Sequence, residues 1–231
     1  MRQVLICWGG WDGHQPDQCA AIVSDMLQVE GFTVRVEAGT AAFADPAIRD
    51  YSLIVPMLTM TKIEKPEIEN LELAIRGGVG LGGFHGQAGD SFRDCVQYQY
   101  MIGGQWVAHP GNIYDYTVEI VKPDDPLVSG VSNFPYRSEQ YYMHVDPNNE
   151  VLATTTFTGE HDAWIDGHVM PVVWKRRRGQ GRVFYSSLGH QATEFEVPQM
   201  REIVRRGLVW AARWGWLNRR ARNALPSSCS G

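Results

Sequence analysis

This chain of 231 residues contains few cysteines and carries no net positive charge. Its four cysteines, Cys7, Cys19, Cys95 and Cys229, show no CxxC spacing, which favours reduced, mostly structural thiols in a cytoplasmic protein. The net charge is −5, so the chain lacks the basic field that a nucleic-acid partner requires. It also lacks a secretory h-region with a cleavage site and any apolar run long enough to cross a bilayer, and we expect no membrane association.

The composition is that of an ordinary globular protein, with 44% hydrophobic and 20% charged residues. A chain of this length fits one large domain better than two, and it can bury a sizeable core. We therefore expect a single domain over residues 1–220 and a frayed C-terminal tail over residues 221–231.

The first half of the chain alternates buried strands with helices. Continuous apolar runs at 3–8, 32–36, 51–58 and 78–84 are typical of strands that are covered on both faces. Helices are expected from Pro16 to Gly31 and from Pro66 to Gly77, because proline suits a first helical turn and glycine a helix end. This order predicts an α/β fold with a doubly wound, mainly parallel sheet.

Shorter strand-like runs follow at 116–121, 137–144, 151–157 and 169–174, without long helices between them. They predict a short mixed or antiparallel extension of the sheet that forms one wall of the site. A last buried strand is expected at 182–187 and a closing helix at 198–216.

The glycine-rich stretch Gly80–Gly89 is the most informative local feature. An apolar strand leads into it and an amphipathic segment, 90–101, leads out, so we expect a strand, a sharp turn and a helix that Asp90 caps. Such turns lie at the carboxyl edge of an open parallel sheet, where ligands bind. A nucleophile elbow has this shape and holds its apex side chain out above the sheet. The apex here is His85 rather than Cys or Ser, so we expect no glutaminase nucleophile.

Three histidines are expected at that same edge, because His14 follows the first strand, His85 the fourth and His190 the last. Imidazoles that converge from separate strand ends suit a divalent transition metal, above all Zn²⁺. His144 ends the 137–144 run and could complete a metal set of His14, His85, His144 and His190 from the side. The alternative is that each histidine only hydrogen-bonds the backbone of its own loop.

Glu139 is the carboxylate that we assign to acid–base catalysis, with His85 and His190 as the other catalytic candidates. If residues 137–144 are one extended strand, Glu139 and His144 point to opposite faces and share a pocket only through a bend. Glu139 is therefore either a catalytic group or metal ligand, or a surface carboxylate.

Aromatic and polar residues near these loops are candidate contacts to a sugar. Flat rings pack against the C–H faces of sugars while polar groups bind the hydroxyls, although such rings also fill protein cores. The candidate substrate-binding residues are Trp11, Asp12, Trp106, His109, Tyr142 and His161.

Six stretches resemble one protein family in content and in order. They are CWGGWDGH (7–14), GGFHGQAGDSFRD (82–94), GGQWVAHPGN (103–112), SEQYYMHVDPNNEVLATTTF (138–157), MPVVWKRRRGQGRVFYSSLGH (170–190) and IVRRGLVWAARW (203–214). By these stretches the chain resembles the trehalose-utilisation (ThuA-like) family. The resemblance implies a flavodoxin-like fold of the class I glutamine-amidotransferase type, with His85 in the nucleophile position and His190 in the position of the triad histidine. Gln87 stands where that elbow would have a second glycine, which argues against thioester chemistry.

The resemblance also implies a role in the catabolism of trehalose, related disaccharides or their 3-keto derivatives, and a metal at the histidine cluster. We therefore expect a metal-dependent enzyme with a small sugar as its partner, and a homo-oligomer is compatible with the sequence. The alternative is a non-catalytic sugar-binding or regulatory module that kept the fold and lost the chemistry. A metal with an open coordination position would favour the enzyme.

Overall fold

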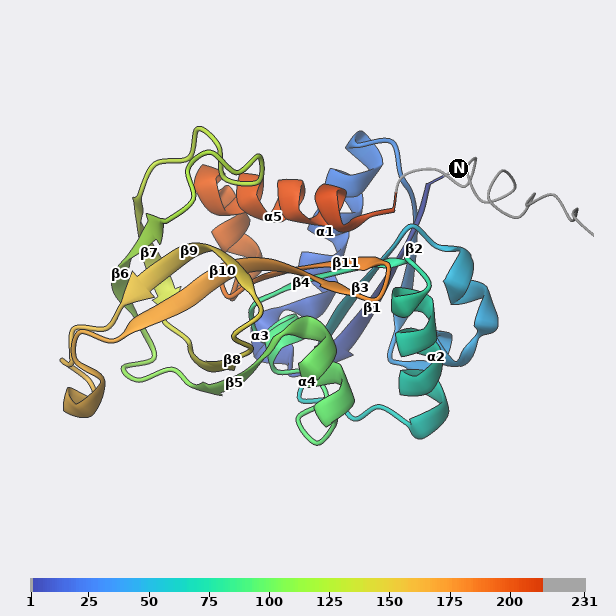
Figure 1. The fold of residues 1–231 in the computed structure, drawn as a ribbon, viewed down its shortest axis with the longest axis horizontal. Coiled ribbons are helices and arrows are strands. Elements are labelled where there is room, and N and C mark those ends of the chain that lie inside the picture. Colours follow the sequence, from blue (N-terminus) through green and yellow to red (C-terminus); the bar gives the residue numbers. More distant parts are fainter. Residues whose placement is uncertain (1, 214–231) are drawn as a thin grey trace, which may run out of the picture.

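The computed structural model describes residues 2–213, which form an α/β fold around one nine-stranded sheet (Figure 1). The strand order is β2-β1-β3-β4-β11-β10-β9-β6-β7. Its first five strands are parallel and comprise β1 (Gln3–Gly10), β2 (Thr33–Ala38), β3 (Leu53–Thr59), β4 (Gly80–Phe84) and β11 (Gly181–Ser186). The mainly parallel sheet that the alternating pattern predicts is therefore present.

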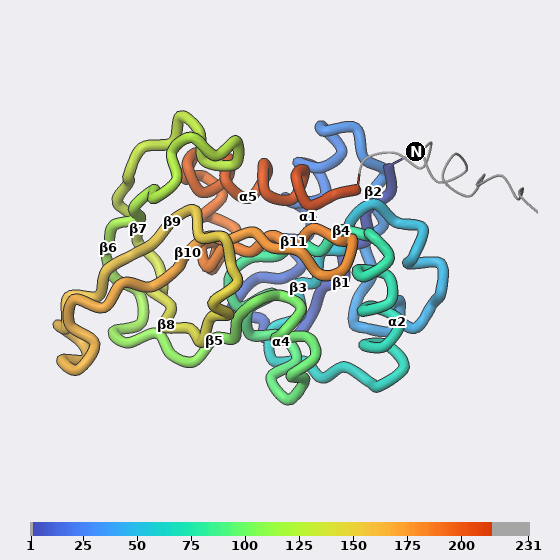
Figure 2. The backbone as a smooth tube through the Cα atoms, in the orientation of Figure 1, coloured from blue at the N-terminus to red at the C-terminus, as the bar shows by residue number. Residues whose placement is uncertain are grey.

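The remaining strands form the antiparallel extension. In the large sheet they are β10 (Val169–Arg178), β9 (Glu150–Thr156), β6 (Ile113–Ile120) and β7 (Phe134–Glu139). A separate pair, β5 (Gly104–Ala108) and β8 (Tyr142–Val145), lies beside it, as the chain trace in Figure 2 shows. The strand predicted at 137–144 is thus two strands, because the chain leaves the large sheet after Glu139 and joins the small one at Tyr142.

Helices cover both faces of the large sheet. Figure 1 shows α1 (Pro16–Val29) and α5 (Pro198–Ala211) on one side, and α2 (Lys65–Arg76) and α4 (Val96–Ile102) on the other. The alternating side chains of β1 explain this arrangement: Val4 and Ile6 pack into the core under α1 and α5, while Leu5 and Cys7 pack into the core under α2 and α4. The five 3₁₀ helices within residues 2–213 are η1 (Asp12–His14), η2 (Ala41–Ala44), η3 (Pro46–Asp50), η4 (Ala163–Ile165) and η5 (Ala192–Glu196).

The helix predicted at 90–101 is placed differently. Helix α3 (His85–Gly89) begins directly after β4, and the chain is irregular until α4 starts at Val96. Asp90 does not cap a following helix, because both of its carboxylate oxygens accept hydrogen bonds from Arg93, at 2.5 and 2.7 Å.

Two further expectations concern the ends of the chain. The described part of the last helix, α5, ends at Ala211, and the proposed tail at 221–231 lies outside the described residues. Within residues 2–213, every helix is too short or too polar to cross a membrane.

Candidate metal and substrate site

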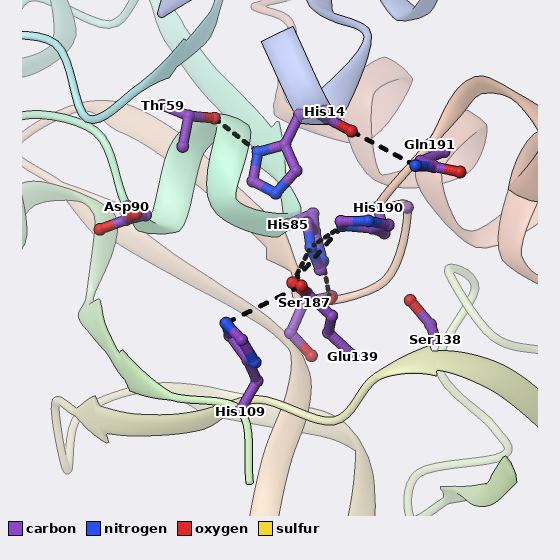
Figure 3. Close-up of polar contacts among 12 residues, drawn as sticks. His14, Thr59, His85, Asp90, His109, Ser138, Glu139, Ser187, His190 and Gln191 are labelled. Carbon is purple, nitrogen blue, oxygen red and sulfur yellow. Dashed lines mark hydrogen bonds and ion pairs between the residues drawn. The ribbon is translucent and has the colours of Figure 1, made fainter. Parts of the chain in front are cut away.

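Four buried side chains meet where the parallel strands end (Figure 3). His14 closes η1 after β1, His85 opens α3 after β4, and His190 follows β11. Glu139 joins them from the end of β7. One ligating atom from each residue lies within 4.8 Å of the other three. The structure therefore brings together the three histidines expected at this edge, and it supplies a carboxylate as the fourth member.

The turn at His85 has the backbone of an elbow. His85 has φ +45°, a left-handed conformation that is uncommon for a residue with a side chain. Gly86 has to be glycine, because a Cβ there would lie 2.4 Å from Cε1 of His14 and 2.7 Å from the Tyr141 hydroxyl. The His85 side chain does not stand out above the sheet as expected. It is fully buried, since the ring of Tyr141 stacks on it at 4.1 Å between centroids.

Hydrogen bonds fix which nitrogen each histidine turns toward the cluster. Nδ1 of His85 lies 2.8 Å from the carbonyl oxygen of Ser187, and a carbonyl only accepts, so this nitrogen carries the proton. Nε2 of His85 then offers its lone pair beside Oε2 of Glu139 at 3.2 Å and Nδ1 of His190 at 3.1 Å. Nδ1 of His14 bonds the Thr59 hydroxyl at 2.7 Å, which leaves Nε2 for the cluster.

The spacing of these atoms fits a first-row metal ion. Tetrahedral zinc with bonds of roughly 2.0–2.2 Å has neighbouring ligand atoms about 3.3–3.6 Å apart. Nε2 of His85, Nδ1 of His190 and Oε2 of Glu139 are separated by 3.1, 3.2 and 3.4 Å. Direct hydrogen bonds produce the same spacing, so the donor set suits a metal and also holds together without one. The metal-ligating roles of these residues stay a prediction.

Burial and mutual contact set the charges in the cluster. Burial, together with the neighbouring His85 and His190, lowers the pKa of His14 to about 2, so this imidazole is neutral and able to ligate. For Glu139 burial raises the pKa, but the contacts with His190 and His85 outweigh it and hold the pKa below its usual range. The cluster thus pairs an ionised carboxylate with nitrogen donors, as a divalent cation requires.

A second carboxylate, Glu194, positions His190. Its Oε2 accepts hydrogen bonds from the backbone N–H groups of Gly189 at 3.2 Å and His190 at 2.9 Å. Its Oε1 accepts one from the Ser138 hydroxyl at 2.9 Å. Glu194 therefore ties the loop after β11 to β7, the strand that carries Glu139.

A pocket of about 330 Å³ opens over the cluster. Its walls are largely aromatic, and its lining comprises Trp11, His14, Met60, Asp90, Trp106, His109, Asn112, Glu139 and Tyr141. Trp11 is 44% exposed at the mouth, and the Arg93 guanidinium lies 4.9 Å from the ring centre of Trp106. Nε2 of His109 is 3.8 Å from Oε1 of Glu139. Flat rings beside a few polar groups are a surface that a sugar ring can occupy.

Three of the candidate sugar contacts, Trp11, Trp106 and His109, line this pocket. Asp12 is exposed on η1, outside the pocket lining that residues 2–213 form. His161 packs against Tyr114, with ring centroids 4.6 Å apart, beside a different cavity. These two positions correct the placement of Asp12 and His161 beside the ligand.

The alternation of β8 explains two more corrections. Met143 is buried, so its neighbours Tyr142 and His144 face the other way. Tyr142 packs against Phe157, Trp164 and His168. His144 is exposed and does not join the cluster. Glu139 takes the position that His144 was expected to fill, because the bend at Gln140 and Tyr141 turns β8 away from β7.

Sequence reasoning missed three residues that shape the site: Thr59, Tyr141 and Glu194. Thr59 and Glu194 look like ordinary strand-end and loop residues, and their role depends on partners far along the chain. Tyr141 looks like a residue of the strand predicted at 137–144, and it turns inward only because the chain bends after Glu139.

The chain is thus an α/β protein with a ligand pocket at the carboxyl edge of its sheet, and a buried histidine–glutamate cluster lies at the base of this pocket. The family model for trehalose utilisation, ThuA, matches residues 3–211, and the chain belongs to this family. No curated protein shows significant sequence similarity to it.

Solved structures share the fold at low sequence identity. A putative ThuA-like protein from Bacteroides uniformis is 18% identical with a TM-score of 0.75, over 91% of each chain. Another, from Parabacteroides merdae, is 16% identical with a TM-score of 0.74, over 91% of this chain and 89% of that one. A cytoplasmic protein from Salmonella typhimurium is 15% identical with a TM-score of 0.60, over 93% of this chain and 100% of that one. These similarities concern the fold alone.

Proposed function

We propose that this protein is a metal-dependent enzyme of carbohydrate catabolism that acts on trehalose, a related disaccharide or a 3-keto derivative of one. The observation that supports the proposal best is the set of four ligating atoms within 4.8 Å of one another, at the base of an aromatic pocket. Membership of the trehalose-utilisation family supports the choice of a sugar. The proposed ion is Zn²⁺, which when bound would polarise a sugar oxygen or activate a water molecule.

The residues of the chain have distinct tasks in this proposal. His14, His85 and His190 are the neutral nitrogen ligands, and Glu139 is the fourth ligand through Oε2. Oε1 of Glu139 remains on the side of His109, where it can accept a proton from the substrate. Trp11 and Trp106 are the flat walls for the sugar ring, and a coordination number above four would keep a position for the substrate.

The same donor set supports a second function. Four protein ligands complete a tetrahedral zinc site, and closed sites of this kind are structural rather than catalytic. A sugar-binding or regulatory module with a structural metal is therefore the alternative. The two functions differ in whether the bound ion exchanges a ligand with the substrate.

A metal analysis of protein purified without a histidine tag tests the proposal. We expect about one divalent ion per chain, lost in chelator and restored by zinc, together with calorimetric binding of trehalose or its 3-keto derivative. His168→Ala is the control, because that exposed side chain lies outside the cluster. Cobalt-substituted protein whose visible spectrum changes on adding sugar would favour the enzyme, and an unchanged spectrum would favour the module. Protein that binds no divalent ion would refute the enzyme and would favour a module without a metal.

We also propose a flavodoxin-like, glutamine-amidotransferase-type origin for the fold. The parallel strands have the order β2-β1-β3-β4-β11, which corresponds to the flavodoxin-like order 2-1-3-4-5. Because His85 is at the apex of the elbow, we expect no release of ammonia from glutamine. The related cytoplasmic protein from Salmonella typhimurium supports a cytoplasmic location. The proposed partner is a small sugar rather than nucleic acid or membrane, and light scattering would show whether the protein forms a homo-oligomer.

A further inference from the structure

Tyr141 occupies a special position beside the elbow. In enzymes that use such an elbow for acyl transfer, the backbone N–H after the apex residue binds the negatively charged oxygen of the substrate. The corresponding residue here is Gly86, and the hydroxyl oxygen of Tyr141 lies 2.7 Å from the Cβ position of this glycine. The side chain of Tyr141 therefore packs against the turn beside which an elbow enzyme holds the substrate oxygen.

The position of Tyr141 is defined by its ring as well as by its hydroxyl. The ring stacks on His85 with an interplanar angle of 29°, and the residue is 4% exposed. The Tyr141 hydroxyl and the His14 ring both contact Gly86. They lie 2.7 Å and 2.4 Å, respectively, from the Cβ position of this glycine. The hydroxyl is thus next to the cluster, and Tyr141 lines the pocket above it.

The hydroxyl proton of Tyr141 is available to a ligand. A phenol has one proton to donate. No hydrogen bond recorded within residues 2–213 uses that proton. A hydroxyl donor that faces a pocket binds an acceptor oxygen most strongly when that oxygen carries negative charge.

We propose that the Tyr141 hydroxyl is the hydrogen-bond donor to the sugar oxygen that lies against the cluster, in place of the backbone N–H of the elbow. The preferred ligand is a sugar with a carbonyl oxygen at that point, because a carbonyl can only accept. This inference rests on the proposed sugar function of the pocket and assigns the group that orients the substrate within it.

Tyr141→Phe tests the assignment, since it keeps the stacking ring and removes only the hydroxyl. Tyr98→Phe is the matched control: Tyr98 is also buried, and its hydroxyl donates one backbone hydrogen bond, to Ala88 at 3.1 Å, away from the pocket. The wild type and both variants are loaded with zinc and compared in metal content and melting temperature. Their affinity and turnover are then measured for trehalose and 3-keto-trehalose.

We expect Tyr141→Phe to keep its zinc and to melt close to Tyr98→Phe. Its affinity for the keto sugar should fall about 3- to 10-fold. Its kcat should fall more than its KM rises, by about 10²-fold, as for the loss of an oxyanion donor. Tyr98→Phe should bind and turn over both sugars like the wild type.

Three outcomes would overturn the assignment, and they can be told apart. Unchanged affinity and turnover in Tyr141→Phe would reject the role of the hydroxyl and leave the proposed function intact. Loss of zinc in Tyr141→Phe would show that the hydroxyl holds the cluster together instead of the substrate. A wild type that binds zinc but neither sugar would reject the sugar function and the role of Tyr141 with it.

Discussion

The Thr59 hydroxyl determines which way the His14 ring faces. It bonds Nδ1 at 2.7 Å, and so Nε2 points into the cluster. Thr59→Val removes this bond while keeping the shape of the side chain. Because groups that orient metal-ligating histidines typically contribute 10- to 100-fold to metal affinity, we expect zinc to bind about 10- to 100-fold more weakly.

Competition with a chromophoric chelator measures this change. Thr154→Val is the control, because Thr154 is also buried and lies on β9, in the extension rather than the site. Equal zinc affinities for the two variants would show that Thr59 does not orient His14.

Glu139 has two proposed roles, as a metal ligand through Oε2 and as a proton acceptor through Oε1. Glu139→Gln keeps the size of the side chain and removes its charge. If Oε2 is a metal ligand, as its contacts of 3.2 and 3.4 Å with two histidines support, zinc affinity should fall more than 10-fold. Zinc content after dialysis against a weak chelator tests this, with exposed Glu160→Gln as the control. Full zinc content with lost turnover would instead make Glu139 a proton acceptor only.

At the scale of single elements, the turn between β4 and α3 holds the site in place. A methyl group on Gly86 would meet His14 at 2.4 Å and the Tyr141 hydroxyl at 2.7 Å. We expect Gly86→Ala to push both groups apart, to destabilise the fold by about 1–3 kcal/mol and to lose zinc. Thermal melting and metal analysis measure the two effects.

Gly77→Ala is the comparison for this substitution. Its closest Cβ contact, the carbonyl oxygen of Leu73, is 3.1 Å away at the end of α2, remote from the histidines. It should keep its zinc. Wild-type zinc content in folded Gly86→Ala would mean that the turn accommodates a side chain and that glycine is not required there.

The sequence alone was sufficient for the elements whose pattern is set by burial. β1 and β3 read as continuous apolar runs because both faces of the parallel sheet are covered, and their order placed His14, His85 and His190 at one edge. The break between β7 and β8 was not predictable in the same way. Gln140 and Tyr141 are compatible with a strand. The chain turns there because Gln140 bonds Thr155 at 2.6 Å and Tyr141 stacks on His85, and both partners are distant in sequence.

At the scale of the whole molecule, the site joins the two halves of the sheet. Three ligands follow parallel strands and the fourth ends an antiparallel strand, so the cluster forms only when both halves have folded. Because a metal that binds only the folded state stabilises it by mass action, zinc should raise the melting temperature of the metal-free protein. We therefore expect metal binding and folding to be coupled in this chain.

Acid should lower the stability of the metal-free protein through His14. Burial, with help from His85 and His190, lowers the pKa of His14 from its usual value of 6.5 to about 2 in the folded state. The unfolded chain therefore takes up a proton on His14 below pH 6.5 that the folded chain does not. The contribution of His14 to the free energy of unfolding of the metal-free protein is fully present above pH 6.5. It is lost as the pH falls toward 2.

Melting temperatures of the metal-free wild type and of His14→Gln test this pH dependence. They are measured between pH 7.5 and pH 4.5, about the range in which an exposed imidazole titrates. The wild type should lose stability more steeply than His14→Gln as the pH falls, because the variant has no group to protonate at this position. His168→Gln, which removes an exposed imidazole, should follow the wild type. Zinc should raise the melting temperature of the wild type at pH 7.5 and less so at pH 4.5, since protons and the metal compete for the same nitrogens. Parallel melting curves for wild type and His14→Gln would show that the imidazole is not held neutral by the fold.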